Sequence, residues 1–246
     1  MHTSYEKPIY QITEYHGKHP CFHDTSKYPW VAEIESQWEV IRDELMDYID
    51  KHGGLRVLNS ALISEKRKWK CIYLSNFSWI TKKNLKHFPK TVKILSALPN
   101  MVFGVFSVLE PHSTLVPHYG DTNTTLRSML GLQIPGKLPE LGIKVGKEEK
   151  GWEEGKIVMF TESHLHTAWN NTDERRILLI FDVLPEEYLP EKHIICSRVL
   201  AGQVLRHLYW RFPFTAKLPS FLDRILYWSL TALWYVYLPF QSSKKL

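Results

Sequence analysis

Histidines in the middle of the chain are the residues whose type and spacing could support metal chemistry. His118 follows Pro117 and precedes a Tyr-Gly-Asp turn, a usual place for a metal ligand at the edge of a strand. His164 and His166 lie two residues apart, so on a strand they would share one face, and both need not be ligands. Neutral imidazole suits Fe(II), which oxygenases commonly bind through two histidines and one carboxylate. These histidines therefore make a non-haem iron site a candidate.

The carboxylate ligand of such a site is missing from its usual place. It is expected two residues after the first histidine, where this chain has Gly120. Asp121 is adjacent, but a shift of one residue along a strand points a side chain to the opposite face. On the spacing rule alone, this absence counts against an iron site.

The order and spacing of residues from about 100 to 185 resemble the aspartyl/asparaginyl β-hydroxylase family. The first part of this resemblance consists of Ser107–Pro111, Pro117–Gly120, Thr122-Asn123-x-x-Leu126-Arg127 and Leu130–Pro135. The second part consists of Trp152–Lys156, Phe160, His166-x-x-Trp169, Arg176 and Asp182-Val183. In that family a glycine can stand where the carboxylate ligand is absent. The resemblance therefore implies that His118 and His166 are the two iron ligands, with water beside Gly120. His164 has no matching role in the family pattern and is the second choice of ligand.

The resemblance also implies a site for 2-oxoglutarate. Arg176 looks like the partner of its distal carboxylate, because a guanidinium can donate two parallel hydrogen bonds to a carboxylate, and Ser107 would donate a further one. Arg127 resembles the arginine that holds the end of the cosubstrate nearest the metal. Many members have a histidine two residues after this arginine, where this chain has Met129. Asp182, at the end of an apolar strand, is expected to be a turn or capping carboxylate.

Short apolar runs separated by Gly, Pro and Asn predict a mainly β fold, a double-stranded β-helix (jelly roll, cupin-like) with N-terminal helices and a C-terminal helical tail. Residues 1–30 are expected to form a loop-like arm. Helices are expected over 34–49, stopped by Gly53-Gly54, and over 90–98 after Pro89. The expected strands are Met101–Leu109, Leu130–Ile134, Gly142–Val145, Ile157–Phe160 and Ile177–Val183.

Composition limits the class of protein. The 246 residues are 44% hydrophobic and 23% charged, as in a folded domain, and the net charge of +5 does not require a nucleic-acid partner. Three widely spaced cysteines form neither a disulfide framework nor a thiolate metal site, and the N-terminus has no apolar run of a secretory signal. We therefore expect a cytoplasmic protein, divided into an oxygenase domain over 1–195 and a basic, aromatic-rich tail over 196–246.

The tail contains an uncharged segment of aromatic and aliphatic residues. The segment Ile225–Phe240 is 16 residues long, short of the roughly 20 needed to cross a bilayer. Basic residues flank it on both sides, as in segments that rest at a membrane surface: Arg206, Arg211, Lys217, Arg224, Lys244 and Lys245. Residues 206–246 therefore predict membrane contact. A helix packed on the domain, or at a dimer interface, is the alternative, and the sequence leaves the oligomeric state open.

The resemblance implies a hydroxylase that uses Fe(II), 2-oxoglutarate and O₂ to insert one oxygen atom into an unactivated C–H bond. A lipid acyl chain is the favoured substrate, because of the tail and because Trp38–Glu44, Trp69–Leu74 and Phe88–Val92 look like the N-terminal part of lipid A and ornithine-lipid hydroxylases. Peptidyl aspartate or asparagine and small amino-acid derivatives are alternative substrates. A catalytically silent, membrane-associated binding module is the alternative from another class. The presence of both arginines argues against it.

Overall fold

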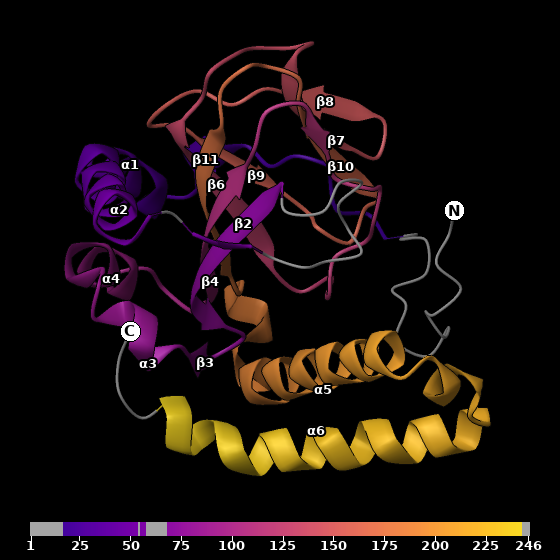
Figure 1. Ribbon diagram of the computed structural model, residues 1–246. Helices are drawn as coiled ribbons and strands as arrows, with labels where there is room; N and C mark the ends of the chain where they lie inside the picture. The colour runs from indigo at the N-terminus through magenta and orange to yellow at the C-terminus, as the bar shows by residue number, and fades with distance from the viewer. Residues whose placement is uncertain (1–16, 54, 58–67, 243–246) are drawn as a thin grey trace.

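The computed structural model describes residues 17–53, 55–57 and 68–242. The strands of the larger sheet are β1 (Arg56–Val57), β2 (Trp69–Asn76), β3 (Trp79–Ile80), β4 (Met101–Leu109), β6 (Leu126–Gln133), β9 (Ile157–Phe160) and β11 (Arg176–Val183). Those of the smaller sheet are β5 (Ser113–Thr114), β7 (Leu141–Val145), β8 (Glu148–Lys150) and β10 (His166–Asn170). The sheet orders are β1-β2-β4-β11-β6-β9, with β3 on β2, and β5-β10-β7-β8. All strand pairs are antiparallel, and the predicted double-stranded β-helix is confirmed (Figure 1).

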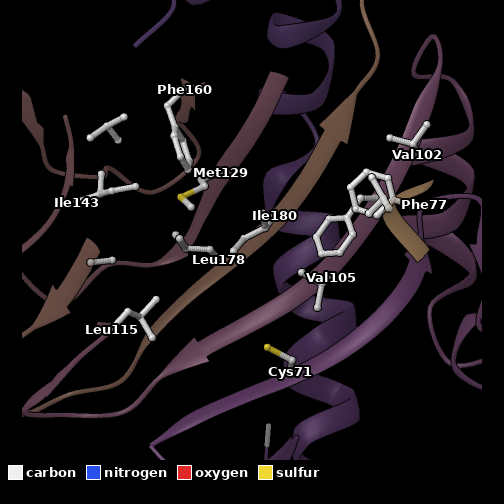
Figure 2. Close-up of a cluster of buried hydrophobic side chains, with 14 of the residues drawn as sticks. Cys71, Phe77, Val102, Val105, Leu115, Met129, Ile143, Phe160, Leu178 and Ile180 are labelled. Carbon is white, nitrogen blue, oxygen red and sulfur yellow. The ribbon is translucent and has the colours of Figure 1, made fainter. Parts of the chain in front are cut away.

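Alternation along β11 separates two hydrophobic clusters. Leu178 and Ile180 point into a cluster that also contains Ile143 of the smaller sheet (Figure 2). Leu179 and Phe181 point to the other face and pack in a second cluster, which includes residues of the N-terminal helices. Because successive side chains of a strand point to opposite faces, even-numbered residues of β11 face the space between the sheets.

Four helices precede β4: α1 (Trp30–Glu35), α2 (Trp38–His52), α3 (Lys82–Leu85) and α4 (Pro89–Ser96). The helix expected over 34–49 is divided between α1 and α2, and Gly53 ends it in the left-handed conformation at φ 72°. The second expected helix is α4, which begins at Pro89 and ends two residues early. Residues 17–29 contain only the short 3₁₀ helix η1 (Thr25–Lys27), in agreement with the predicted arm, and residues 1–16 lie outside the described residues.

Two strands that matter for the site, β2 and β10, were not predicted. The predicted strand over 130–134 begins earlier, at Leu126, so Arg127 lies within β6. The other four predicted strands correspond to β4, β7, β9 and β11 to within one residue at each end.

The C-terminal helices are α5 (Lys192–Arg211) and α6 (Ser220–Ser242), and they lie side by side beneath one end of the larger sheet (Figure 1). The short helices η2 (Glu186–Glu191) and η3 (Pro213–Lys217) precede and follow α5. Val199 and Leu200 of α5 and Leu238 of α6 join the core cluster of the sheets. The predicted helical tail is confirmed, although the division after residue 195 falls inside α5 and stays a prediction. In the described ranges, none of the helices has the length and apolar character needed to cross a membrane.

Packing of α2 on the larger sheet gives a stability prediction. Ile41 is fully buried, whereas the adjacent Val40 is 42% exposed. Ile41→Ala should lower the free energy of unfolding by about 2–4 kcal/mol, because it leaves a cavity in the core. Val40→Ala should change it by less than about 0.5 kcal/mol. Urea denaturation measures both values, and equal losses in the two variants would contradict this packing.

Candidate metal centre and cosubstrate pocket

His118 and His166 are brought together by backbone pairing. His118 lies between β5 and β6, His166 begins β10, and the two residues form an isolated antiparallel bridge. The N–H group of each donates to the carbonyl oxygen of the other, at 3.0 Å and 2.9 Å. Their ring centroids are 4.2 Å apart. Residues 48 positions apart in the sequence therefore present adjacent imidazoles.

Hydrogen bonds define the tautomers of both rings. Nδ1 of His118 lies 2.8 Å from the carbonyl oxygen of Val116, and Nδ1 of His166 lies 2.9 Å from that of His164. A carbonyl oxygen only accepts, so each Nδ1 donates a proton to it, and Nε2 is the nitrogen of each ring that could bind a metal. Burial, and after it the neighbouring His118, hold the pKa of His166 well below its usual value. His166 is therefore a neutral imidazole.

His164, the second choice of ligand, points elsewhere. Its Nε2 lies 2.9 Å from the carbonyl oxygen of His19 in the N-terminal segment. Across the described ranges, no group of three or more His, Cys, Asp or Glu side chains is arranged to hold a metal ion.

The side chain of Glu162 fills the space beside Gly120. A Cβ atom on Gly120 would lie 2.4 Å from Cγ of Glu162 and 2.6 Å from its Oε2. The Gly120 N–H also donates to the Glu162 carbonyl oxygen at 2.7 Å. A side chain at position 120 would thus displace Glu162, which the sequence analysis missed although it precedes His166 by four residues. Asp121 does point away, as expected, and accepts from Gln203 of α5 at 2.7 Å.

Arg127 of β6 lies between two buried carboxylates. Its Nε and Nη2 donate to Asp182 at 2.9 Å and 2.7 Å, and its Nη1 lies 2.6 Å from Oε2 of Glu162. Burial raises the pKa of Asp182 and that of Glu162, the latter to about 8. The prediction that Asp182 is a turn or capping carboxylate is wrong, because it is inside β11 and is the register partner of Arg127.

Arg176 is a buried cation that lacks a partner anion among the residues with described positions. It is 2% exposed, on the inner face of β11, and its guanidinium lies 5.1 Å from the centroid of the Trp152 ring. Its Nε has no hydrogen-bond partner in the described chain. Burial lowers the pKa of Arg176 to about 10. A buried charge without an anion is unfavourable, so this guanidinium is arranged for an anionic ligand.

Ser107 and Met129 line the same interior. Ser107 of β4 is paired in register with Leu178, two residues after Arg176. The indole N–H of Trp69, which the sequence analysis did not single out, donates to Oγ of Ser107 at 2.9 Å, and the hydroxyl can then donate onward. Met129 is buried beside Leu178 (Figure 2). Its thioether cannot donate a hydrogen bond, unlike the histidine that many family members have at this position.

Taken together, the jelly roll, the imidazole pair and the buried guanidinium define the architecture of a β-barrel hydroxylase. A sequence model described as aspartyl/asparaginyl beta-hydroxylase matches residues 35–185. The chain belongs to this family.

Individual relatives differ in their named substrates. The chain is 29% identical over 218 residues to an ornithine lipid ester-linked acyl 2-hydroxylase of Rhizobium tropici, covering 83% of this chain and 78% of that protein. It is 32% identical over 168 residues to the human aspartyl/asparaginyl beta-hydroxylase, covering 66% of this chain but only 22% of that much longer protein. Among solved structures, a prolyl-4-hydroxylase of Pseudomonas putida has a TM-score of 0.43 at 11% identity, covering 63% of this chain and 99% of that one, a weak overall likeness.

The contact between Gly120 and Glu162 can be tested with a double-mutant cycle. Gly120→Ala alone should reduce the free energy of unfolding by about 1–3 kcal/mol, because its methyl group overlaps the Glu162 side chain. In a Glu162→Ala background the same change should cost less than about 1 kcal/mol, because the space is then open. Chemical denaturation of the four proteins gives the coupling. An equal cost in both backgrounds would show that the two residues are not in contact.

Proposed function

We propose that the protein is an Fe(II)- and 2-oxoglutarate-dependent hydroxylase in which His118 and His166 bind the metal and Arg176 binds the cosubstrate. The observation that carries this proposal is the pair of adjacent imidazoles in a barrel whose interior also holds a buried guanidinium. A pair of imidazoles suits a divalent transition metal, and an enclosed guanidinium suits a carboxylate.

The charged side chains near the histidines favour the binding of a cation. Glu162 and Asp182 together share one guanidinium, that of Arg127. When both carboxylates are ionised, this group carries a net negative charge. It lies against Gly120, two residues after His118. A divalent cation nearby would offset that charge and would favour the ionised form of Glu162 over the protonated form that burial favours.

The arginines suit the two ends of a diacid. Arg176, with Ser107 as a second donor, would hold the distal carboxylate in the apolar interior. Arg127 has five N–H groups, of which three are engaged by Asp182 and Glu162. The remaining two would hold the end of 2-oxoglutarate nearest the metal. Met129 adds no hydrogen bond there, so Arg127 alone would bear that role.

Bound iron, with 2-oxoglutarate and O₂, supplies the oxidising chemistry that hydroxylates an unactivated C–H bond and releases succinate and CO₂. The chain's own contribution is to position and to shield. The backbone bridge between His118 and His166 holds both rings, and the hydrogen bonds to Val116 and His164 keep each Nε2 available for the metal. The apolar residues around Met129 limit the access of water.

For the substrate we propose a lipid acyl chain. The relative from Rhizobium tropici, named as an acyl hydroxylase of ornithine lipid, is matched over most of both chains. The human relative, named for aspartyl and asparaginyl residues, is matched over about a fifth of its length. The exposed apolar surface of α6 also suits access to lipid rather than to a peptide.

Ligand binding tests the site residue by residue. Arg176→Lys should weaken 2-oxoglutarate binding by about 100-fold, because a lysine cannot make the paired hydrogen bonds. The adjacent Arg175→Lys is the matched control and should leave binding unchanged. Likewise His118→Ala and His166→Ala should abolish Fe(II) binding, whereas His164→Ala should retain it. Calorimetry under anaerobic conditions measures the affinities for Fe(II) and for 2-oxoglutarate. Retained 2-oxoglutarate affinity in Arg176→Lys, or retained metal affinity in both ligand variants, would remove the basis of the proposal.

The substrate has a separate test. Expression of the protein in a bacterial host should add the mass of one oxygen atom to the acyl chains of extracted lipids, and His166→Ala should not. Mass spectrometry of lipids and of tryptic peptides from the same cells compares the alternatives. Modification of peptides alone would assign the peptidyl substrate, and succinate release without either product would point to a small amino-acid derivative. Absence of both 2-oxoglutarate binding and succinate release would favour the silent binding module.

A further inference from the structure

Helix α6 has one buried face and one continuous apolar exposed face. The buried face packs on α5 and the barrel, and includes Asp223, Thr231 and Leu238. On the opposite face, residues recur at three- and four-residue steps, which places them in one stripe along the helix. The exposed stripe consists of Phe221, Ile225, Trp228, Ala232, Leu233, Tyr235, Val236 and Phe240. It contains no charged residue.

A second group of exposed aromatic residues extends this surface around the turn between α5 and α6. Trp210, Phe212 and Phe214 are all exposed there. We refer to these three residues and the stripe on α6 together as the α6 face. An exposed apolar surface of this extent on a folded domain marks an interaction site.

The charged residues of the C-terminal helices are almost all basic. Residues 192–242 contain six Lys or Arg and one acidic residue, Asp223, although the whole chain has a net charge of only +5. Asp223 is buried and accepts from the hydroxyl of Tyr209 at 3.1 Å. Arg198, Arg211, Lys217 and Arg224 are exposed, and the Arg198 guanidinium lies 5.6 Å from the centroid of the Trp228 ring at the edge of the stripe.

We propose that the α6 face rests in the interfacial layer of an anionic membrane, with the axis of α6 parallel to the surface. Trp and Tyr side chains with a fringe of Arg and Lys suit the boundary between acyl chains and negatively charged headgroups. A parallel orientation follows from the packing, because the other face of α6 is covered by α5 and the barrel, so only one face is available to lipid. The proposal deepens the proposed lipid hydroxylation by naming the surface through which the substrate membrane is reached.

Helix α5 connects this surface to the metal site. Gln203 and Arg206 of α5 both bind the carboxylate of Asp121, three residues after His118. Burial alone would raise the pKa of Asp121, but Arg206 and Gln203 outweigh it and hold that pKa below its usual value. The carboxylate is therefore ionised and fixed between the metal loop and α5. Contact of the α6 face with a membrane would thus place the His118 loop in a defined position relative to the lipid.

Vesicle binding by the full chain, without cosubstrate, tests the docking independently of turnover. The protein should sediment together with phosphatidylglycerol vesicles. The double substitution Ile225→Ser/Val236→Ser should weaken vesicle binding by about ten-fold or more, because two side chains of the stripe no longer enter the interface. The control is Val40→Ser/Leu138→Ser, which changes two exposed apolar residues elsewhere (42% and 41% exposed) and should bind as the unsubstituted protein does. Arg211→Gln should weaken binding about five-fold on these vesicles and have no effect on phosphatidylcholine vesicles.

Either of the following two outcomes would overturn the proposal. Equal binding by the stripe variant and by the control variant would exclude the α6 face as the contact. If the protein binds no vesicles, and sedimentation velocity shows a dimer that Ile225→Ser/Val236→Ser converts to a monomer, a second copy of the chain covers this face instead. These measurements need neither iron nor 2-oxoglutarate. A protein that does not bind vesicles would therefore contradict only the membrane docking and not the proposed hydroxylation. An inactive enzyme that still binds vesicles would contradict only the hydroxylation.

Discussion

The fixed alternation of side chains along β11 is the constraint on which the rest of the site depends. Arg176 and Asp182 are six residues apart on one strand, so both face the space between the sheets. Register with β4 puts Ser107 near the first, and register with β6 puts Arg127 against the second. A shift of one residue in either register would turn these polar groups into the outer cluster, where α2 and α4 pack. The apolar residues between them, Leu178 and Ile180, oppose such a shift because they belong to the inner core.

Buried charge organises this interior into two different environments. Around Arg127 the positive charge is compensated, because Asp182 accepts two hydrogen bonds from the guanidinium and Glu162 forms an ion pair with it. Around Arg176 it is not compensated. The guanidinium lies over the Trp152 ring, and the thiol of Cys71, which interacts with it, stays protonated because burial raises the pKa of Cys71 to about 12. The first environment lies beside Gly120, in the loop that carries His118. In the second, an anionic ligand would offset the buried charge, as the proposed binding of a cosubstrate requires.

The C-terminal helices are part of the same arrangement rather than an appendage. The buried face of α5 completes the core at one end of the larger sheet, and Gln203 fixes the loop that carries His118 through Asp121. The outer helix, α6, covers α5 but leaves its own apolar face exposed. One pair of helices therefore contacts the core, the metal loop and the molecular surface.

The sequence by itself predicted the candidate site residues and some of the strands that bear them. The resemblance of residues 100–185 to the hydroxylase family pointed to His118, His166 and Arg176, because the order and spacing of such motifs can be read directly from the sequence. It did not find β2, whose start follows a charged run at Glu65–Lys68 and whose pairing with β4 joins residues 29 to 40 positions apart.

Only the tertiary structure decided the role of Glu162 and Asp182. Glu162 fills the space beside Gly120, and Asp182 pairs with Arg127, which is 55 residues earlier in the chain. A local sequence pattern predicts neither contact. The physical reason is that the position of a buried charge is decided by which partners the folded chain brings within hydrogen-bonding distance.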